Sequence, residues 1–123
     1  MDACINEPEL KLSIITASCN SEKYIEDAIK SVLMQTYRNI EHIIIDGGST
    51  DRTLDIINKY SRNLGFVSSE PDSGIYEAFN KGIKASSGDI IYFLNSDDYL
   101  YDEASVESII KVFRDDNKLD IVY

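Results

Sequence analysis

The sequence has few of the residues that mark several common protein classes. It contains two cysteines, Cys4 and Cys19, and a single histidine, His42. Two cysteines are too few for a disulfide framework or a zinc cluster, so we expect both thiols to be reduced. Because His42 is the one histidine, a nucleophilic cysteine–histidine pair is disfavoured. We expect His42 to be a partly buried strand residue instead.

Long apolar runs and clusters of basic residues are also missing. No apolar run approaches the roughly 20 residues that a membrane-spanning helix needs. The first nine residues are acidic and lack the basic and apolar regions of a signal peptide, which favours a cytoplasmic protein. The net charge is −10, and the 12 basic residues are scattered, which argues against a nucleic-acid surface or a polybasic membrane patch. An anionic ligand would need a bound cation, a helix N-terminus or backbone amides.

With 123 residues, 43% of them hydrophobic, the chain can form one globular domain with a core. We expect residues 1–11 to be a tail and residues 12–123 to be one domain, cut short at its C-terminus because the last residues look like an unfinished strand. Short apolar runs alternate with segments of helical periodicity. Strands are expected at 12–18, 41–45, 66–69, within 88–98 and from 119.

Helices are expected between these strands. The first follows the N-cap Ser21, the second follows a cap at Ser49, Thr50 or Asp51, the third spans 75–85, and the fourth follows a cap at or near Asp102. Their apolar positions are Ile25, Ala28, Ile29, Val32 and Leu33, then Leu54, Ile57 and Tyr60, and finally Val106, Ile109, Ile110 and Phe113. Such alternation predicts an α/β fold with a mostly parallel sheet and helices on both faces.

Acidic residues follow two of the expected strands. The strand within 88–98 runs into Asn95-Ser96-Asp97-Asp98, and the strand at 41–45 runs into Asp46-Gly47-Gly48. In open parallel sheets ligands bind beyond the carboxyl ends of the strands, so we expect both groups at one edge. Adjacent carboxylates repel each other unless a cation or a donor-rich ligand takes up the charge, and Mg²⁺ or Mn²⁺ suits oxygen ligands. The alternative is a solvated loop with turn and N-cap chemistry.

Several motifs follow one another in a specific order. They are Ser13-Ile14-Ile15-Thr16 leading to Asn20, then Asp46-Gly47-Gly48-Ser49-Thr50-Asp51, then Gly82 to Gly88 before Leu94-Asn95-Ser96-Asp97-Asp98. Together they resemble the nucleotide-binding half of family 2 glycosyltransferases, and the resemblance runs from Leu12 onward. Glu70-Pro71-Asp72-Ser73-Gly74-Ile75-Tyr76 with Asn80-Lys81-Gly82 is similar to a subgroup that builds polysaccharides. The resemblance implies a Rossmann-like GT-A fold.

The resemblance also implies roles for individual residues. Ala17, Cys19, Asp46, Gly47 and Gly48 would flank the nucleoside, and Asp98 would be the ligand of a Mg²⁺ or Mn²⁺ ion. Asp97 would face the ribose or the donor sugar. Neighbouring residues on extended backbone point to opposite sides, which independently favours unequal roles for the two carboxylates.

Three further positions bear on this site. We expect Tyr76 to be a nucleotide-sugar-binding residue, since its ring can pack in the core while its hydroxyl reaches the crevice. For Lys81 an exposed helix surface is favoured over a phosphate contact. Gly47 stands where many family members carry a second aspartate associated with the base, and Ala17 and Cys19 replace the more usual Pro or Thr and Tyr. We therefore expect modest discrimination between UDP and GDP or dTDP, dependent on Asp46.

The implied reaction is a metal-dependent, inverting transfer of a sugar from a nucleotide-diphosphate donor to a hydroxyl group. The donor would be a UDP-sugar, and the acceptor a saccharide or a lipid-linked molecule in polysaccharide or glycoconjugate synthesis. In the family the general base lies after the part that this chain covers, so no catalytic residue is assigned here. The parent protein would be cytoplasmic, and could be peripheral to the membrane.

Two other functions fit parts of the sequence. A nucleotide-sugar-binding module without catalysis would need only this half of the fold. A phosphorelay receiver domain matches the chain in size, acidity and alternating elements, and it binds Mg²⁺ through aspartates. It would need an acidic pair just after the first strand, whereas this strand runs into Ala17-Ser18-Cys19-Asn20.

Overall fold

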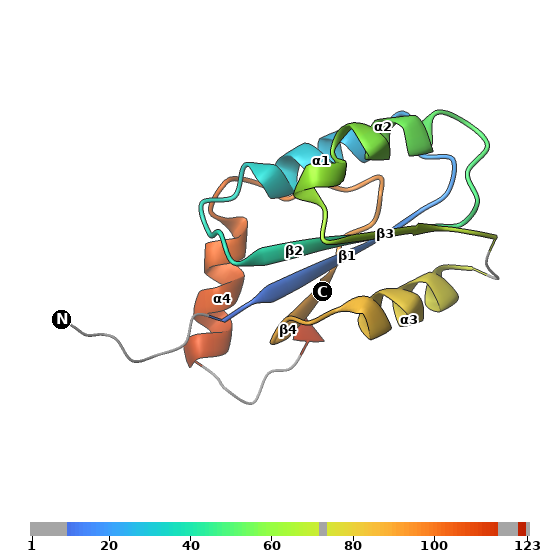
Figure 1. Ribbon diagram of the computed structural model, residues 1–123. Helices are drawn as coiled ribbons and strands as arrows, with labels where there is room; N and C mark the ends of the chain where they lie inside the picture. Colours follow the sequence, from blue (N-terminus) through green and yellow to red (C-terminus); the bar gives the residue numbers. More distant parts are fainter. Residues whose placement is uncertain (1–9, 72–73, 116–120, 123) are drawn as a thin grey trace.

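The computed structural model describes residues 10–71, 74–115 and 121–122, which form a sheet between two helical layers (Figure 1). β1, β3 and α3 have the predicted bounds. Within the described residues the strands are β1 Leu12–Ser18, β2 Ile40–Asp46, β3 Phe66–Ser69, β4 Ile90–Phe93 and β5 Ile121–Val122. The helices are α1 Ile25–Leu33, α2 Thr53–Lys59, α3 Ile75–Ala85 and α4 Ser105–Asp115, with a short 3-10 helix at Ser61–Asn63.

All pairings in the sheet are parallel, and the strand order is β3-β2-β1-β4-β5. This confirms the predicted α/β class with a parallel sheet. It matches the first five strands of the 3-2-1-4-5-6 order of Rossmann folds, and it differs from the 2-1-3-4-5 order of flavodoxin-like receiver domains. Because the chain first builds outward to β3 and then returns beyond β1, the direction of winding reverses between β1 and β4. A crevice is expected at the carboxyl ends of these two strands.

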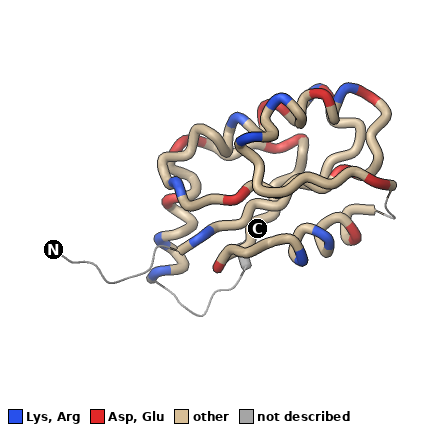
Figure 2. Tube along the Cα trace, in the orientation of Figure 1, with Lys and Arg blue, Asp and Glu red and all other residues tan. Residues whose placement is uncertain are grey.

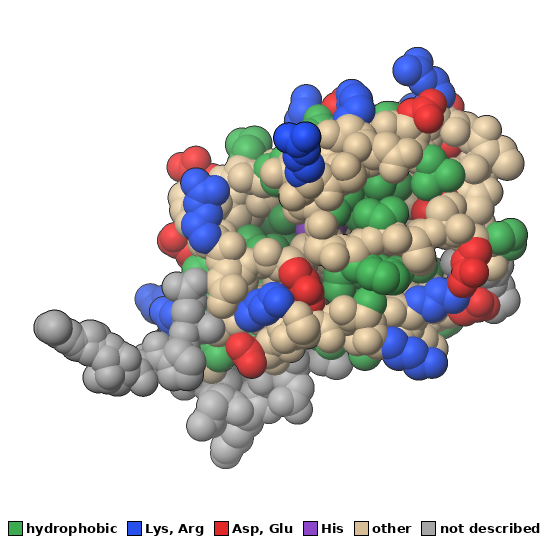
Figure 3. Space-filling view, viewed as in Figure 1, with side chains coloured by type: hydrophobic (Ala, Val, Ile, Leu, Met, Phe, Trp, Pro, Cys, Tyr) green, Lys and Arg blue, Asp and Glu red, His purple; other side chains and the backbone are tan. Residues whose placement is uncertain are grey.

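The two faces of β1 pack against different helices. Leu12 and Ile14 belong to a cluster with buried residues of α1 and α4, while Ile15 packs with Ala78 of α3. α2 extends the first layer through Ile57, which packs with residues of α1 and β2. In the space-filling view apolar side chains gather between the α1–α2 layer and α3 (Figure 3). The predicted covering of both faces is confirmed.

Two predictions about the first helix are wrong. Ser21 does not cap α1 with its side chain, because a turn at residues 22–24 delays the start of the helix to Ile25. The carbonyl oxygen of Ser21 instead accepts hydrogen bonds from the backbone N–H groups of Tyr24 and Ile25, both at 2.9 Å. Leu33, expected on the apolar face, is 38% exposed at the last turn.

Two predicted caps, Asp51 and Asp102, accept backbone hydrogen bonds at the starts of their helices, although the N-cap position of α2 itself is Arg52. Asp51 Oδ1 accepts a hydrogen bond from the N–H of Thr53, the first residue of α2, at 2.9 Å. Asp102 Oδ1 accepts one from the N–H of Ala104, just before α4, at 2.9 Å. Each carboxylate thus satisfies a backbone donor that a helix start leaves without an intrahelical partner.

His42 is fully buried rather than partly buried as expected. Its side chain lines a small cavity together with Val32 and Leu33 of α1, and its Nε2 lies 2.8 Å from Thr16 Oγ1. Burial lowers the pKa of His42 from 6.5 to about 4, because the charged imidazolium would lose its hydration. Cys19 is a free, exposed thiol, and Cys4 lies outside the described residues.

Lysine, arginine, aspartate and glutamate are interspersed along the trace, as the scattered basic residues of the sequence predict (Figure 2). Among the described residues, none of the helices combines the length and apolarity needed to cross a membrane.

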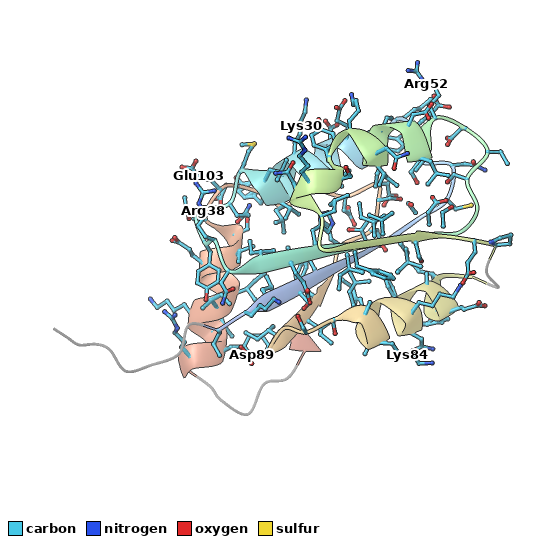
Figure 4. The ribbon with its side chains drawn as sticks, in the orientation of Figure 1. Lys30, Arg38, Arg52, Lys84, Asp89 and Glu103 are labelled. Atoms are coloured by element: carbon cyan, nitrogen blue, oxygen red, sulfur yellow. The ribbon has the colours of Figure 1, made fainter. Side chains whose placement is uncertain are left out.

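The contact between α3 and β1 depends on Gly82. A Cβ atom at this position would lie 2.4 Å from Ile15 Cγ2, so a larger side chain would force the helix away from the sheet. We expect Gly82→Ala to lower the free energy of unfolding by about 1–3 kcal/mol, as overpacking of a core does. Lys84→Ala on the same helix is the matched control, since Lys84 points away from the sheet (Figure 4). Urea denaturation of the three proteins would contradict this packing if Gly82→Ala were no less stable than Lys84→Ala.

Candidate functional site

Two adjoining cavities lie at the carboxyl ends of the strands, where the crevice is expected. Each has a volume of about 460 Å³, and Ile75 at the start of α3 contributes to both walls. The first cavity is lined by Ala17, Ser18, Cys19, Gly47, Gly74, Ile75 and Ala78. The second cavity is lined by Ile75, Phe79, Tyr92, Phe93, Leu94, Asn95, Asp98 and Tyr99.

The sequence-predicted site residues divide between these cavities and their surroundings. Ala17, Cys19 and Gly47 line the first cavity, and Asp98 lines the second. The structure thus brings the expected nucleoside-flanking residues and the expected metal ligand to one edge of the sheet. The remaining four, Asp46, Gly48, Tyr76 and Asp97, are not among the lining residues of either cavity.

Asp46 is completely buried, and its carboxylate accepts hydrogen bonds from within the protein. The donors to Oδ1 are the hydroxyls of Ser18 and Ser49, and the donors to Oδ2 are the N–H groups of Gly48 and Ser49 and the hydroxyl of Ser69, at distances from 2.5 to 3.1 Å. Burial by itself raises the pKa of Asp46, but these hydrogen bonds, above all those from Ser49, bring it below 3.8. The carboxylate therefore holds the turn after β2 in shape.

The turn after β2 also requires a glycine at position 48. Gly48 has a φ of 84°, a conformation that residues with a side chain rarely adopt. A Cβ atom there would lie 3.2 Å from the backbone nitrogen of Pro71. Gly48 thus allows the turn after β2 to lie against the loop after β3, next to the first cavity.

Asn20 ends the first motif of the resemblance, but it was not predicted to be a site residue. It has a φ of 50°, which asparagine tolerates better than most residues. Its Oδ1 accepts hydrogen bonds from the N–H groups of Thr50 and Asp51 at 2.8 and 3.3 Å, and its own N–H donates to Ser49 Oγ at 2.8 Å. Asn20 therefore joins the loop after β1 to the turn after β2. An asparagine directly after a strand was the available signal.

Asp97 and Asp98 lie in a turn and not on extended backbone as expected. The N–H of Asp98 donates to the carbonyl oxygen of Asn95 at 3.0 Å, and both aspartates are exposed. The two still differ in position, since Asp98 lines the second cavity together with Asn95. The described residues contain no cluster of three or more histidine, cysteine, aspartate or glutamate side chains that could hold a metal. The side-chain oxygens of Asp98 and Asn95 fit a Mg²⁺ or Mn²⁺ ion that takes its other ligands from phosphates and water.

Two predictions about α3 need correction. Tyr76 is 82% exposed, so its ring does not pack in the core. It follows Ile75 in the first turn of α3. Lys81 is not simply solvated, because its Nζ lies 2.7 Å from Glu70 and 3.5 Å from Glu77. The hydrogen bond with Glu70 is the main cause that raises the pKa of Lys81, and it links α3 to the loop after β3.

The described linings of both cavities contain no lysine or arginine. The basic residues labelled in Figure 4, among them Lys30 and Arg52, project from the outer surface. A diphosphate in this crevice would meet Asp98 and the start of α3, whose positive dipole end and backbone N–H groups favour anions. The charges of the site thus suit an anionic ligand that brings a cation with it.

Comparison with known proteins shows the family of the chain. The model described as Glycosyl transferase family 2 matches residues 13–123. A PGL/p-HBAD biosynthesis glycosyltransferase of Mycobacterium bovis is 33% identical over 114 residues, which cover 90% of this chain and 44% of that protein. The structure of S. aureus TarS 1-349 in complex with UDP-GlcNAc has a TM-score of 0.81 and 29% identity, covering 88% of this chain and 32% of that one.

A third similarity extends to a more distant sequence. The mannosyltransferase PcManGT from Pyrobaculum calidifontis, in complex with GDP-Man and Mn²⁺, has a TM-score of 0.81 and 19% identity, over 89% of this chain and 34% of that one. At this identity the likeness shows the fold alone. The expected Rossmann-like GT-A fold is confirmed by these neighbours. The chain spans less than half the length of each of the three proteins.

The buried carboxylate of Asp46 generates a stability prediction. We expect Asp46→Asn to lower the free energy of unfolding at pH 7 by about 1–3 kcal/mol, because the amide removes the charge and turns an acceptor into a donor that faces other donors. Since the folded-state pKa lies below 3.8, the carboxylate's contribution is complete above that unfolded-state value and is lost as the pH falls through the folded-state value. Denaturation with urea at pH 7 and through the acid range measures both effects.

His42 adds a separate pH dependence of stability that is common to the unmodified chain and to Asp46→Asn. Its folded-state pKa of about 4 lies below the ordinary 6.5, so stability declines as the pH falls below 6.5 with or without Asp46. The difference in the free energy of unfolding between the unmodified chain and Asp46→Asn therefore does not contain the contribution of His42. Asp55→Asn, on the exposed side of α2, is the matched control and should change stability by less than about 0.5 kcal/mol. Equal stability of Asp46→Asn and Asp55→Asn would contradict the assigned role.

Proposed function

Because the chain belongs to glycosyl transferase family 2, we propose that it is the donor-binding part of an enzyme that transfers a sugar from a UDP-sugar to a hydroxyl group, with inversion. The acceptor would be a saccharide or a lipid-linked molecule in polysaccharide or glycoconjugate synthesis. The observation that carries the proposal is the pair of adjoining cavities, one lined by three of the expected nucleoside-flanking residues and the other by Asp98. A cytoplasmic location, peripheral to the membrane in the parent protein, stays a prediction.

The nucleoside is proposed to bind in the first cavity. Ala17, Cys19 and Gly47 form its wall, and the small side chains leave room for a base and a ribose. Asp46 and Gly48 would act on the nucleoside through the shape of the turn, because the carboxylate of Asp46 is buried. Base discrimination between UDP and GDP or dTDP should therefore be modest. Support comes from TarS, which is 29% identical to this chain and whose structure is a complex with UDP-GlcNAc.

The diphosphate and the sugar are proposed to extend toward the second cavity. Asp98, with the neighbouring Asn95, would hold a Mg²⁺ or Mn²⁺ ion, and the exposed Asp97 would contact the ribose or the donor sugar. When bound, such an ion stabilises negative charge on a departing diphosphate. The residues themselves orient the donor: Asp98 fixes the diphosphate end, and the first cavity fixes the nucleoside end. Tyr76, exposed at the start of α3, is available to an acceptor or to the donor sugar.

The alternative of a nucleotide-sugar-binding module without catalysis shares this donor site. It differs in having no acceptor hydroxyl to deprotonate. A receiver domain is not supported, since both the strand order and the family match differ from it.

The metal role of Asp98 can be measured directly. We expect UDP to bind the 123-residue chain more tightly in Mn²⁺ than in EDTA, because the cavity linings supply no basic side chain to the diphosphate. Asp98→Ala should remove this difference, and Asp97→Ala should weaken binding in both conditions. Asp55→Ala is the matched carboxylate control outside the site. Calorimetry that found equal UDP affinity in Mn²⁺ and in EDTA for the unmodified chain would refute the proposed metal role.

A further prediction concerns turnover. We expect the 123-residue chain to bind donor without transferring sugar at an enzymatic rate. Asp98 is the one carboxylate among the described linings of the two cavities, while Asp102 caps α4 and Glu107 is exposed. A missing general base alone removes about 10² to 10⁴ in rate. Incubation with radiolabelled UDP-sugars and a panel of saccharide and lipid-linked acceptors tests this, and repeated turnover would mean that one of these carboxylates is the base.

A further inference from the structure

The turn that carries Asp97 and Asp98 is fixed at both of its flanks. Before it, the N–H of Leu94 donates to the carbonyl oxygen of Ile15 on β1 at 2.9 Å. After it, the N–H of Leu100 donates to Ser31 Oγ on α1 at 3.0 Å. The residues between these two points include the exposed Asp97, Asp98 and Tyr99. The flanks alone therefore leave the orientation of the turn open.

Ser96 provides a contact within the turn itself. It is only 9% exposed, in contrast to Asn95 and Asp97 on either side. Its Oγ lies 2.7 Å from Ser21 Oγ, in the loop after β1. Through this hydroxyl pair the side chain of Ser96 contacts the loop after β1. The N–H of Asp98 donates to the carbonyl oxygen of Asn95 and closes the turn around Ser96. A contact that fixes Ser96 therefore also fixes the position of Asp98.

Ser21 is itself held firmly from several directions. Its N–H donates to Thr53 Oγ1 at 2.8 Å, and its carbonyl oxygen accepts from Tyr24 and Ile25. The preceding residue, Asn20, bonds to the turn after β2. The hydroxyl of Ser21 is thus a fixed point that belongs to the loop beside the first cavity.

We propose that Ser96 is a positioning residue: its hydrogen bond with Ser21 orients the turn so that Asp98 faces the second cavity, and so strengthens metal-dependent binding of a nucleoside diphosphate. Ser96 itself touches no ligand and acts through Asp98. The bond also couples the loop at the first cavity to the turn at the second. The ligand part of this inference rests on the proposed function, while the orientation of the turn does not.

The first test measures UDP affinity by calorimetry in Mn²⁺ and in EDTA. Ser96→Ala should weaken the affinity in Mn²⁺ by about 3- to 10-fold, the effect expected for one lost hydrogen bond, and leave the affinity in EDTA unchanged. Ser21→Ala should give the same loss, and the double variant no more than either. Ser96→Thr keeps a hydroxyl and should retain most of the affinity. In an Asp98→Ala background Ser96→Ala should have no further effect.

Ser108→Ala is the matched control, since its hydroxyl is exposed on α4 and donates a local hydrogen bond to the carbonyl oxygen of Ala104. A merely structural role of Ser96 would lower the affinity equally in Mn²⁺ and in EDTA, and would persist in the Asp98→Ala background. Either result would overturn the inference, as would full affinity of Ser96→Ala in Mn²⁺.

The second test needs no ligand. Hydrogen exchange of the Asp98 amide, which bonds to Asn95, should be faster in Ser96→Ala and in Ser21→Ala than in the unmodified chain, and unchanged in Ser108→Ala. If the unmodified chain bound no UDP, the proposed donor site would fail, and this exchange measurement would still decide whether Ser21 orients the turn. An unchanged exchange rate in both serine variants would refute the orienting role.

Discussion

The burial of one carboxylate is the constraint on which this edge of the sheet depends. A carboxylate without solvent must find hydrogen-bond donors, or the fold loses several kcal/mol. Asp46 meets this demand with donors from Ser18 at the end of β1, from Ser69 at the end of β3, and from the turn that follows it. The ends of three neighbouring strands are thereby held around one side chain. The first cavity opens beside this centre, so its shape depends on a residue that does not line it.

The loops around the crevice extend this arrangement with neutral groups. Asn20 joins the loop after β1 to the turn after β2 through an amide oxygen, and Ser21 reaches Ser96 after β4 through a pair of hydroxyls. Serine, threonine and asparagine are short, so each can bond to nearby backbone without the entropy cost of ordering a long charged side chain. The contacts that position the loops thus involve Asn20, Ser21 and Ser96, and not the side chains of the exposed Asp97 and Asp98.

Much of the fold could be predicted from the sequence, because apolar periodicity and turn residues act locally. β1, β3 and α3 have the predicted bounds, and Asp51 and Asp102 accept backbone hydrogen bonds at the starts of α2 and α4. The failures involve tertiary contacts. Ser21 has the right chemistry for a cap, but Ser96 and Thr53 take up its polar groups. Asp46 was placed correctly at a strand end, yet its inward orientation depends on hydroxyls from two other strands. The exposure of Tyr76 likewise follows from how α3 lies on the sheet.

The contacts of Asn20 and Ser21 with Ser49 and Ser96 join uncharged groups, and this separates two responses to ionic strength. Salt screens interactions between solvent-exposed charges, with a Debye length of about 10 Å at 0.1 M, and has much less effect on hydrogen bonds between uncharged groups. The hydroxyl and amide contacts of Asn20, Ser21 and Ser96 should hold their geometry from dilute buffer to high salt. Attraction between an exposed acidic turn and a cation should weaken over the same range. The two cavities would then keep their shape in concentrated salt, while the attraction of Asp97 and Asp98 for a cation would be much weaker.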